Sequence, residues 1–211
     1  MNSLIEFDGN LLIGIQHTLN ADWLTPFMKF ISMLCNGGCF WIALCLILLL
    51  FKKTRRLGII CTLSLLMTFL ICNLCIKPVV NRTRPWITFP EVTAFLPPPG
   101  DASFPSGHSA NSMGTAWAMF LATMPVKIGT RKSYEDVPCL GWKGSGADPR
   151  MMHRLSIILV VLAVLIGISR LYLGMHYPSD VICGLLLGMI CAGIVHIIIK
   201  KTEDGRGIIG A

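Results

Sequence analysis

Long runs of apolar residues alternate with short polar segments along most of this chain, and several runs approach membrane-spanning length. A transmembrane helix needs about 20 predominantly apolar residues. The pattern predicts five spans: Leu34–Phe51, Leu57–Ile76, Ser106–Met124, Leu155–Ile168 continuing to Ser169, and Val181–Ile199. We expect an all-α polytopic membrane helix bundle, with the third span at its centre because its small residues permit close helix packing.

The N-terminal part of the chain is more polar. In Ser3–Leu19, apolar residues recur among acidic and amide side chains, which is typical of an amphipathic helix lying in the membrane interface. A second helical piece begins near Asp22–Pro26 and is interrupted by an Asn-Gly-Gly sequence. We therefore expect residues 1–33 to form an interfacial or re-entrant segment, making six helical units in all. Residues 34–200 would form one transmembrane domain, and residues 201–211 a polar tail.

Two long loops separate the predicted spans. Residues 78–105 contain Pro85, Pro90 and Pro97–Pro99, so we expect no helix there. A loop of this length is usually functional or disordered. Residues 125–154 form a second long loop, which is basic and contains Gly and Pro.

Composition supports a membrane protein and excludes several other classes. The 211 residues are 54% hydrophobic and 14% charged, with a mean hydropathy of +0.67, whereas soluble domains are about 25% charged. Most of the nine cysteines lie in apolar runs, where they behave as small hydrophobes. Cys72 and Cys75 have metal-site spacing without a second pair, so we expect no metal. The net charge of +7 lacks a basic face interleaved with aromatics, so we expect no nucleic-acid partner.

Four polar clusters meet on one side of the predicted bundle. Successive spans alternate in direction, so the ends of spans two and four and the starts of spans three and five share one membrane face. Lys77, Pro105–His108, Arg170 and Asp180 occupy those four positions. Polar groups at bilayer depth are costly and mark functional sites. Their convergence predicts a site.

The predicted site has the composition of a phosphate seat. Lys77, Arg84 and Arg170 are three cations without enough nearby acidic residues to neutralise them. Guanidinium groups match phosphate oxygens two at a time. Ser106 and Gly107 open a helix, whose free amides and positive dipole end favour an anion.

Two histidines would supply the chemistry. A carboxylate at Asp180 can fix one ring nitrogen of His176 and leave the other as a nucleophile. His108 would then donate the proton to the leaving oxygen. The alternative is structural: Arg170 and His176 would be interfacial side chains that reach toward water, and Asp180 a helix cap after Pro178.

The motifs resemble the three-part signature of the type 2 phosphatidic acid phosphatase family, whose active-site design is shared with vanadium haloperoxidases. They read Lys77-x6-Arg84-Pro85, Pro105-Ser106-Gly107-His108, and Ser169-Arg170-x5-His176-x3-Asp180. Every fixed position of the signature is matched, and the membrane helices around it also fit the family's bundle.

The resemblance implies a role for each motif residue. His176 would form a phosphohistidine, Asp180 would activate it, and His108 would be the acid and later the base for water. The phosphoryl oxygens would be bound by Lys77, Arg84, Ser106, Gly107 and Arg170. No metal or cofactor is implied. Asn73, Arg82 and Trp86 lie beside the motifs, and the sequence leaves open whether they take part; His153 and His196 are assigned no chemistry.

By resemblance, this is an integral-membrane lipid phosphatase acting on a lipid phosphomonoester or pyrophosphate. Candidate substrates are undecaprenyl diphosphate, phosphatidylglycerol phosphate, phosphatidate and diacylglycerol pyrophosphate, and the short chain favours the first. One alternative is a phosphotransferase that passes the same phosphoryl group to an alcohol. Another is a catalytically silent transporter or scaffold built on the same bundle.

The basic residues predict which side the site faces. Of the 18 Lys and Arg residues, thirteen fall on one side of the predicted topology: four at 52–56, six at 125–154 and three in the tail. The other side carries Lys29, Lys77, Arg82, Arg84 and Arg170. Cytoplasmic flanks are enriched in Lys and Arg. We therefore expect a cytoplasmic (inner) membrane protein whose site opens to the extracytoplasmic side, and Met1–Asn20 lacks the features of a signal peptide.

Overall fold

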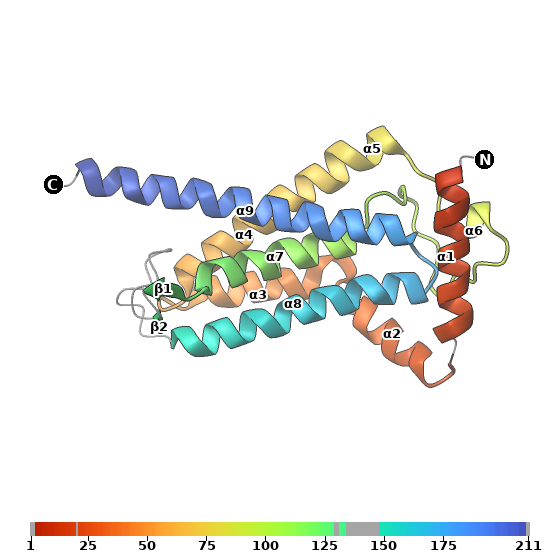
Figure 1. The fold of residues 1–211 in the computed structure, drawn as a ribbon, viewed down its shortest axis with the longest axis horizontal. Coiled ribbons are helices and arrows are strands. Elements are labelled where there is room, and N and C mark those ends of the chain that lie inside the picture. Colours follow the sequence, from red (N-terminus) through yellow and green to blue (C-terminus); the bar gives the residue numbers. More distant parts are fainter. Residues whose placement is uncertain (1–2, 20, 129–130, 134–147, 210–211) are drawn as a thin grey trace.

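The computed structural model describes residues 3–19, 21–128, 131–133 and 148–209 (Figure 1). Its α-helices are α1 (Ser3–Leu19), α2 (Leu24–Met33), α3 (Cys39–Leu50), α4 (Arg55–Phe69), α5 (Lys77–Val80), α6 (Pro85–Thr88), α7 (Gly107–Thr123), α8 (Pro149–Tyr172) and α9 (Pro178–Ile209). A 3₁₀ turn, η1 (Asn36–Gly38), precedes α3, and a π-helix, η2 (Leu70–Ile76), joins α4 to α5. Two short strands, β1 (Val126–Ile128) and β2 (Arg131–Ser133), pair antiparallel.

The chain is a multi-pass membrane protein. Within the described residues, three helical segments are long and apolar enough to cross a bilayer: Arg55–Thr88, Pro149–Tyr172 and Pro178–Thr202. The pair formed by Leu24–Met33 and Asn36–Leu50, bent by 45°, could make a fourth. The 17-residue helix α7 falls short of that length. The predicted total of five spans and six helical units is therefore not confirmed by this criterion.

Helix α7 lies at the centre of the bundle, as predicted. Its most extensive contacts are with α9, α8 and α4, and most of its residues are buried. The contact with α9 depends on glycine: a Cβ at Gly188 would lie 2.5 Å from the carbonyl oxygen of Ala110. The backbones therefore approach as closely as in other small-residue membrane interfaces.

Helix α1 crosses one end of the bundle, while β1 and β2 lie at the other end (Figure 1). Its inner face buries Leu12 in an apolar cluster with Phe89, Val92 and Tyr177. Its outer face exposes Leu4, Phe7 and Leu11. The helix is therefore amphipathic, as its sequence pattern predicts; its place in the membrane interface stays a prediction.

Several predicted boundaries are wrong. The first span does not begin at Leu34, because Gly37 and Gly38 adopt positive φ angles of 60° and 72° and helix α3 starts after them, at Cys39. Helix α8 begins at Pro149, six residues before the predicted span, since Pro suits the first turn of a helix. Helix α9 continues through most of the predicted tail, to Ile209.

Neither predicted loop is free of regular structure. The segment 78–105 contains most of α5 and all of α6, in which Pro78 and Pro85 occupy first-turn positions that need no amide donor. The segment 125–154 contains the β1–β2 hairpin and the first turns of α8, so the all-α description needs this one exception.

Candidate functional site

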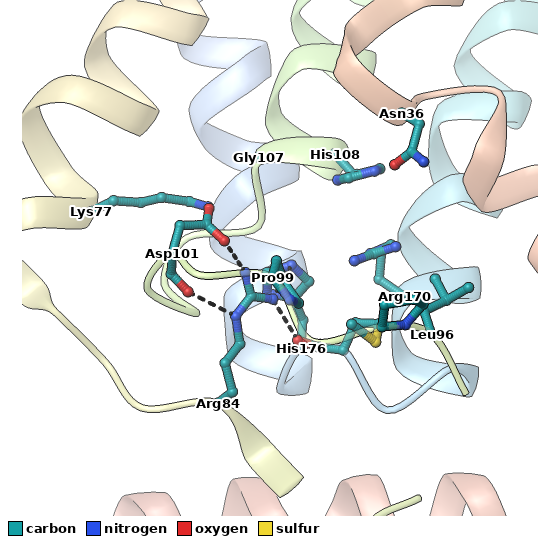
Figure 2. A pocket seen from close by; sticks show the side chains of 12 residues that line it. Asn36, Lys77, Arg84, Leu96, Pro99, Asp101, Gly107, His108, Arg170 and His176 are labelled. Carbon is teal, nitrogen blue, oxygen red and sulfur yellow. Dashed lines mark hydrogen bonds and ion pairs between the residues drawn. The ribbon is translucent and has the colours of Figure 1, made fainter. Parts of the chain in front are cut away.

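The site lies at the end of the bundle that α1 crosses. A cavity of about 240 Å³ opens there, and Figure 2 shows side chains from separate elements converging on it. Its lining consists of Asn36, Lys77, Arg84, Leu96, Pro97, Pro99, Asp101, Gly107, His108, Arg170, Met175 and His176. Six of the eight predicted site residues are in this set. Ser106 and Asp180 are buried behind it.

His176 lies in the turn between α8 and α9 and is 1% exposed. Its Nε2 lies 3.1 Å from Nη1 of Arg84, on the cavity side. Its Nδ1 lies 3.6 Å from Oδ2 of Asp180, slightly beyond hydrogen-bond distance. Burial, together with the positive charges of nearby Arg84, Arg170 and Lys77, holds the pKa of His176 well below its ordinary value. The imidazole is therefore neutral at physiological pH.

Asp180 sits in the first turn of α9 and has no exposed surface. Its Oδ2 accepts hydrogen bonds from the Tyr177 amide at 2.9 Å and the Ser103 hydroxyl at 2.5 Å, and its Oδ1 accepts one from Arg82 at 2.7 Å. The bond to the Tyr177 amide resembles half of a capping box, in which the third helical residue reaches back to the cap. Asp180 is thus not the N-cap that the structural alternative proposed: it is the third residue of α9, and its carboxylate both reaches back to the Tyr177 amide and lies beside His176.

The start of α7 forms the opposite wall. His108 is the second residue of α7, and its Nε2 is buried with no hydrogen-bond partner in the described part of the chain. A Cβ at Gly107 would lie 3.2 Å from Oδ1 of Asn73 and 3.9 Å from Nζ of Lys77, so glycine keeps the amide end of the helix accessible. The Ser106 hydroxyl caps α7 by accepting from the Ser109 amide and does not line the cavity.

The expectation of unneutralised cations is wrong for two of the three. Asp101 forms ion pairs with both Lys77 and Arg84 (Figure 2). Burial alone would raise the pKa of Asp101, but hydrogen bonding to Lys77 and the charges of Lys77 and Arg84 outweigh it, and the pKa is lowered. The Asp101 carboxylate therefore lies between Lys77 and Arg84, where an anionic ligand could otherwise bind.

Arg170, near the end of α8, keeps part of its donor capacity free. Its Nη1 donates to the Ser32 hydroxyl on α2 at 2.6 Å, while its buried Nε has no hydrogen-bond partner among the described residues. Buried donors without partners are costly. Together with Nε2 of His108, the Arg170 guanidinium is therefore arranged for a polar ligand in the cavity.

Sequence reasoning missed several residues of the site. Asn36 lines the cavity, and its side chain points toward His108 in Figure 2. Ser32 and Ser103 hold Arg170 and Asp180. Asp101 could have been identified from the sequence, because it is an isolated acidic residue just before the second motif. No sequence pattern distinguishes Asn36, Ser32 or Ser103 as site residues.

The three residues left open have different positions. Trp86 lies beside Arg84, with its ring centroid 5.7 Å from the guanidinium carbon. Asn73 donates to the carbonyl of Phe69 and lines a neighbouring cavity. Arg82 bonds to Asp180 and Asp8. Neither His153 nor His196 lines the site cavity.

The neighbouring cavity is larger and more apolar. It has a volume of about 560 Å³ and shares four residues with the first: Lys77, Asp101, Gly107 and His108. Its apolar wall includes Ile42, Leu65, Leu66 and Phe69. In the part of the chain that the structure describes, no group of three or more His, Cys, Asp or Glu side chains could hold a metal ion.

The chain is similar to known proteins in both sequence and fold. The model of the PAP2 superfamily matches residues 57–204. The undecaprenyl-diphosphatase of Sulfolobus acidocaldarius is 34% identical over 149 residues, covering 70% of this chain and 58% of that protein. Phosphatidylglycerophosphatase B of Bacillus subtilis is 30% identical, covering 93% and 77%. The crystal structure of the PAP2-type phosphatidylglycerolphosphate phosphatase from Bacillus subtilis superposes with a TM-score of 0.67 at 26% identity, covering 98% of this chain and 88% of that one.

Proposed function

This chain belongs to the PAP2 superfamily, and from that premise we propose that it is an integral-membrane lipid phosphatase working through a phosphohistidine. The observation that carries the proposal is the position of His176. Its neutral imidazole presents Nε2 to a cavity that also contains Lys77, Arg84 and Arg170. A nucleophile facing a set of cations is what transfer of a phosphoryl group requires.

Substrate binding is assigned to the three cations and the start of α7. A phosphoryl group in the cavity takes the place of the Asp101 carboxylate on Lys77 and Arg84 and accepts from the unpaired donor of Arg170. The amide end of α7 at Gly107 supplies further donors. These groups neutralise the equatorial oxygens as the transition state develops.

The chemistry takes two balanced steps. Binding of the negatively charged phosphate offsets the cations around His108 and allows it to carry a proton. Nε2 of His176 attacks phosphorus with its lone pair, and the bond from phosphorus to the leaving oxygen breaks as that oxygen takes this proton from His108. His108, now neutral, removes a proton from water, and the resulting oxygen attacks phosphorus. The phosphorus–nitrogen bond then breaks, releasing inorganic phosphate and returning both histidines to their starting state. Asp180, beside Nδ1, stabilises the positive charge that develops on His176.

No cofactor enters this scheme, because Lys77, Arg84 and Arg170 provide the charge that a divalent cation provides in other phosphoryl-transfer sites. Asp101, which has to move off Lys77 and Arg84, lines the cavity and has a half-exposed side chain.

For the substrate, we propose a lipid whose phosphate or diphosphate enters the cationic cavity while its first apolar segment lies in the neighbouring apolar cavity. Relatives are named for undecaprenyl diphosphate and for phosphatidylglycerophosphate. Undecaprenyl diphosphate is the first candidate. The phosphate would be met on the extracytoplasmic side of the cytoplasmic membrane, because the residues at 52–56 and the β1–β2 hairpin lie at the basic, opposite end of the bundle.

The two rivals make different predictions. A phosphotransferase would use the same phosphohistidine but deliver it to an alcohol. A silent transporter or scaffold has no need of His176, His108 and the cations in a single cavity, so the intact set favours an enzyme.

The test is phosphate release by detergent-purified protein from a panel of lipid phosphates and diphosphates, with and without alcohol acceptors. We expect release without an alcohol, and an acid-labile phosphoenzyme on His176 that is absent in His176→Asn. The matched control is His17→Asn, an exposed histidine on α1. Wild-type turnover in His176→Asn, or turnover only with an alcohol present, would contradict the proposal.

A further inference from the structure

The Arg82 guanidinium joins two carboxylates from distant parts of the chain. Its Nη1 donates to Oδ1 of Asp180 at 2.7 Å, and its Nη2 donates to Oδ2 of Asp8 at 2.7 Å. The guanidinium carbon lies 3.9 Å from the ring centroid of Tyr177, the residue after His176. A guanidinium that bonds through both terminal nitrogens and stacks on a ring has little freedom to move.

Asp8 is held as firmly on its other side. It is 5% exposed on the inner face of α1, and its Oδ1 accepts from the Ser179 amide at 3.1 Å. The Ser179 hydroxyl donates to its Oδ2. Asp8 therefore sits at the N-terminus of α9, where the helix dipole favours a carboxylate. This contact ties α1 to the turn that carries His176.

The bonds to Asp180 determine how its carboxylate is oriented. Oδ1 accepts a hydrogen bond from Arg82, and Oδ2 accepts hydrogen bonds from the Ser103 hydroxyl and the Tyr177 amide. Oδ2 is also the oxygen that lies 3.6 Å from Nδ1 of His176. Without Arg82, Oδ1 loses this charged partner and only the two bonds at Oδ2 hold the carboxylate, so its orientation toward His176 is less tightly fixed. Without Asp8, the whole charge of Arg82 acts on Asp180 and weakens its stabilisation of the His176 imidazolium.

We propose that Asp8 and Arg82 are positioning residues that orient Asp180 toward His176, so that docking of α1 on the bundle sets the rate of phosphoryl transfer. The inference rests on the proposed function. Neither side chain lines the substrate cavity, so their effect must pass through Asp180. A residue that only anchors α1 would change the amount of folded protein and leave the rate per folded molecule unaltered.

The test compares Asp8→Asn with Glu6→Gln, which removes the same charge from an exposed position on the same helix. In full-length purified protein, we expect Asp8→Asn to lower kcat about tenfold, as loss of a supporting partner does at other sites. KM should stay within about twofold, because no substrate contact is lost. Glu6→Gln should match the wild type. The rate of phosphoenzyme formation in a single turnover should fall with kcat.

The second part of the test uses variants of Arg82. Arg82→Gln should lower kcat at least as much as Asp8→Asn, and the double variant should be no slower than Arg82→Gln alone, because both act through one carboxylate. If Asp8→Asn does not fold, Arg82→Lys takes its place: an ammonium cannot bridge both carboxylates as a fork does, so kcat should fall at constant KM.

Each outcome is decisive. An unchanged kcat per folded molecule in Asp8→Asn, or additive losses in the double variant, would overturn the positioning role while leaving the phosphatase intact. A parallel rise in KM would also overturn it, since that would place the pair in substrate binding. A wild-type protein that releases no phosphate would overturn the proposed function and this inference together.

Discussion

Arg84 donates a hydrogen bond from Nη2 to Oδ1 of Asp101 at 2.5 Å. The same carboxylate pairs with Lys77 through its other oxygen. A side-chain anion thus holds two of the cations that the proposed mechanism needs for phosphate. Substrate and Asp101 compete for the same donors.

Neutralising Asp101 should therefore tighten anion binding. In Asp101→Asn we expect the inhibition constant for inorganic phosphate to fall about threefold to fivefold, a modest factor because the Asp101 side chain is 50% exposed and solvent screens the pairs. The free protein should melt at a lower temperature, since Lys77 and Arg84 lose their partner, and added phosphate should restore the melting temperature. Glu91→Gln, exposed in the same segment, is the control. Weaker phosphate inhibition in Asp101→Asn would contradict competition.

The lowered pKa of His176 gives a sign for pH-dependent stability. The unfolded chain takes up a proton at this residue near its ordinary pKa of about 6.5, whereas the folded protein does not until far lower pH. The unfolded state thus binds more protons in that window, so stability falls as pH drops below about 6.5, by at most about 1.4 kcal/mol per pH unit. Thermal melts at pH 7 and pH 5 should show a larger loss for the wild type than for His176→Asn. An equal loss would show that His176 titrates normally in the folded protein.

Activity should survive chelation and be blocked by orthovanadate. Lys77, Arg84 and Arg170 supply the charge around the phosphoryl group, so EDTA should change kcat little. Vanadate adopts the trigonal-bipyramidal shape of the transferring group and should compete with substrate in the same cavity. The measurement is phosphate release with EDTA and with increasing vanadate. Loss of activity in EDTA that added magnesium restores would refute the metal-free scheme.

The orientation in the membrane can be tested by labelling. In a background free of other cysteines, Thr93→Cys, exposed on the site side, should react with a membrane-impermeant maleimide in intact cells. Lys53→Cys, exposed in the turn between α3 and α4, should not react until the membrane is permeabilised. Ser145, in the predicted cytoplasmic loop, should behave like Lys53 and lies outside the described residues. The reverse pattern would place the site in the cytoplasm and argue against a substrate presented outside.

A helical membrane protein, and several of the residues that line its polar cavity, could be predicted from the amino-acid sequence alone. Membrane spans can be predicted from apolar runs because a segment in lipid must pair its own backbone polar groups and present apolar side chains. Both requirements are local to the segment. Alternation of the spans brought the three motifs to one end of the bundle without any coordinates. Six of the eight predicted residues line one cavity for this reason. Helix ends were less well predicted: the first span was expected to begin at Leu34, but the turn that contains Gly37 and Gly38 separates α2 from α3, which begins at Cys39.

The partners of the charged side chains could be identified only from the three-dimensional arrangement of the helices. The partners of Arg82 lie 74 and 98 residues away, and those of Arg84 include Asp101, 17 residues on. No periodicity connects such positions, because the pairing depends on where the helices cross and which way the loops return. Helix α1 illustrates the point: its pattern predicts an interfacial helix, but the burial of Asp8 against Arg82 and Ser179 arises only when α1 lies across the start of α9. A buried ion pair depends on its surroundings for its geometry.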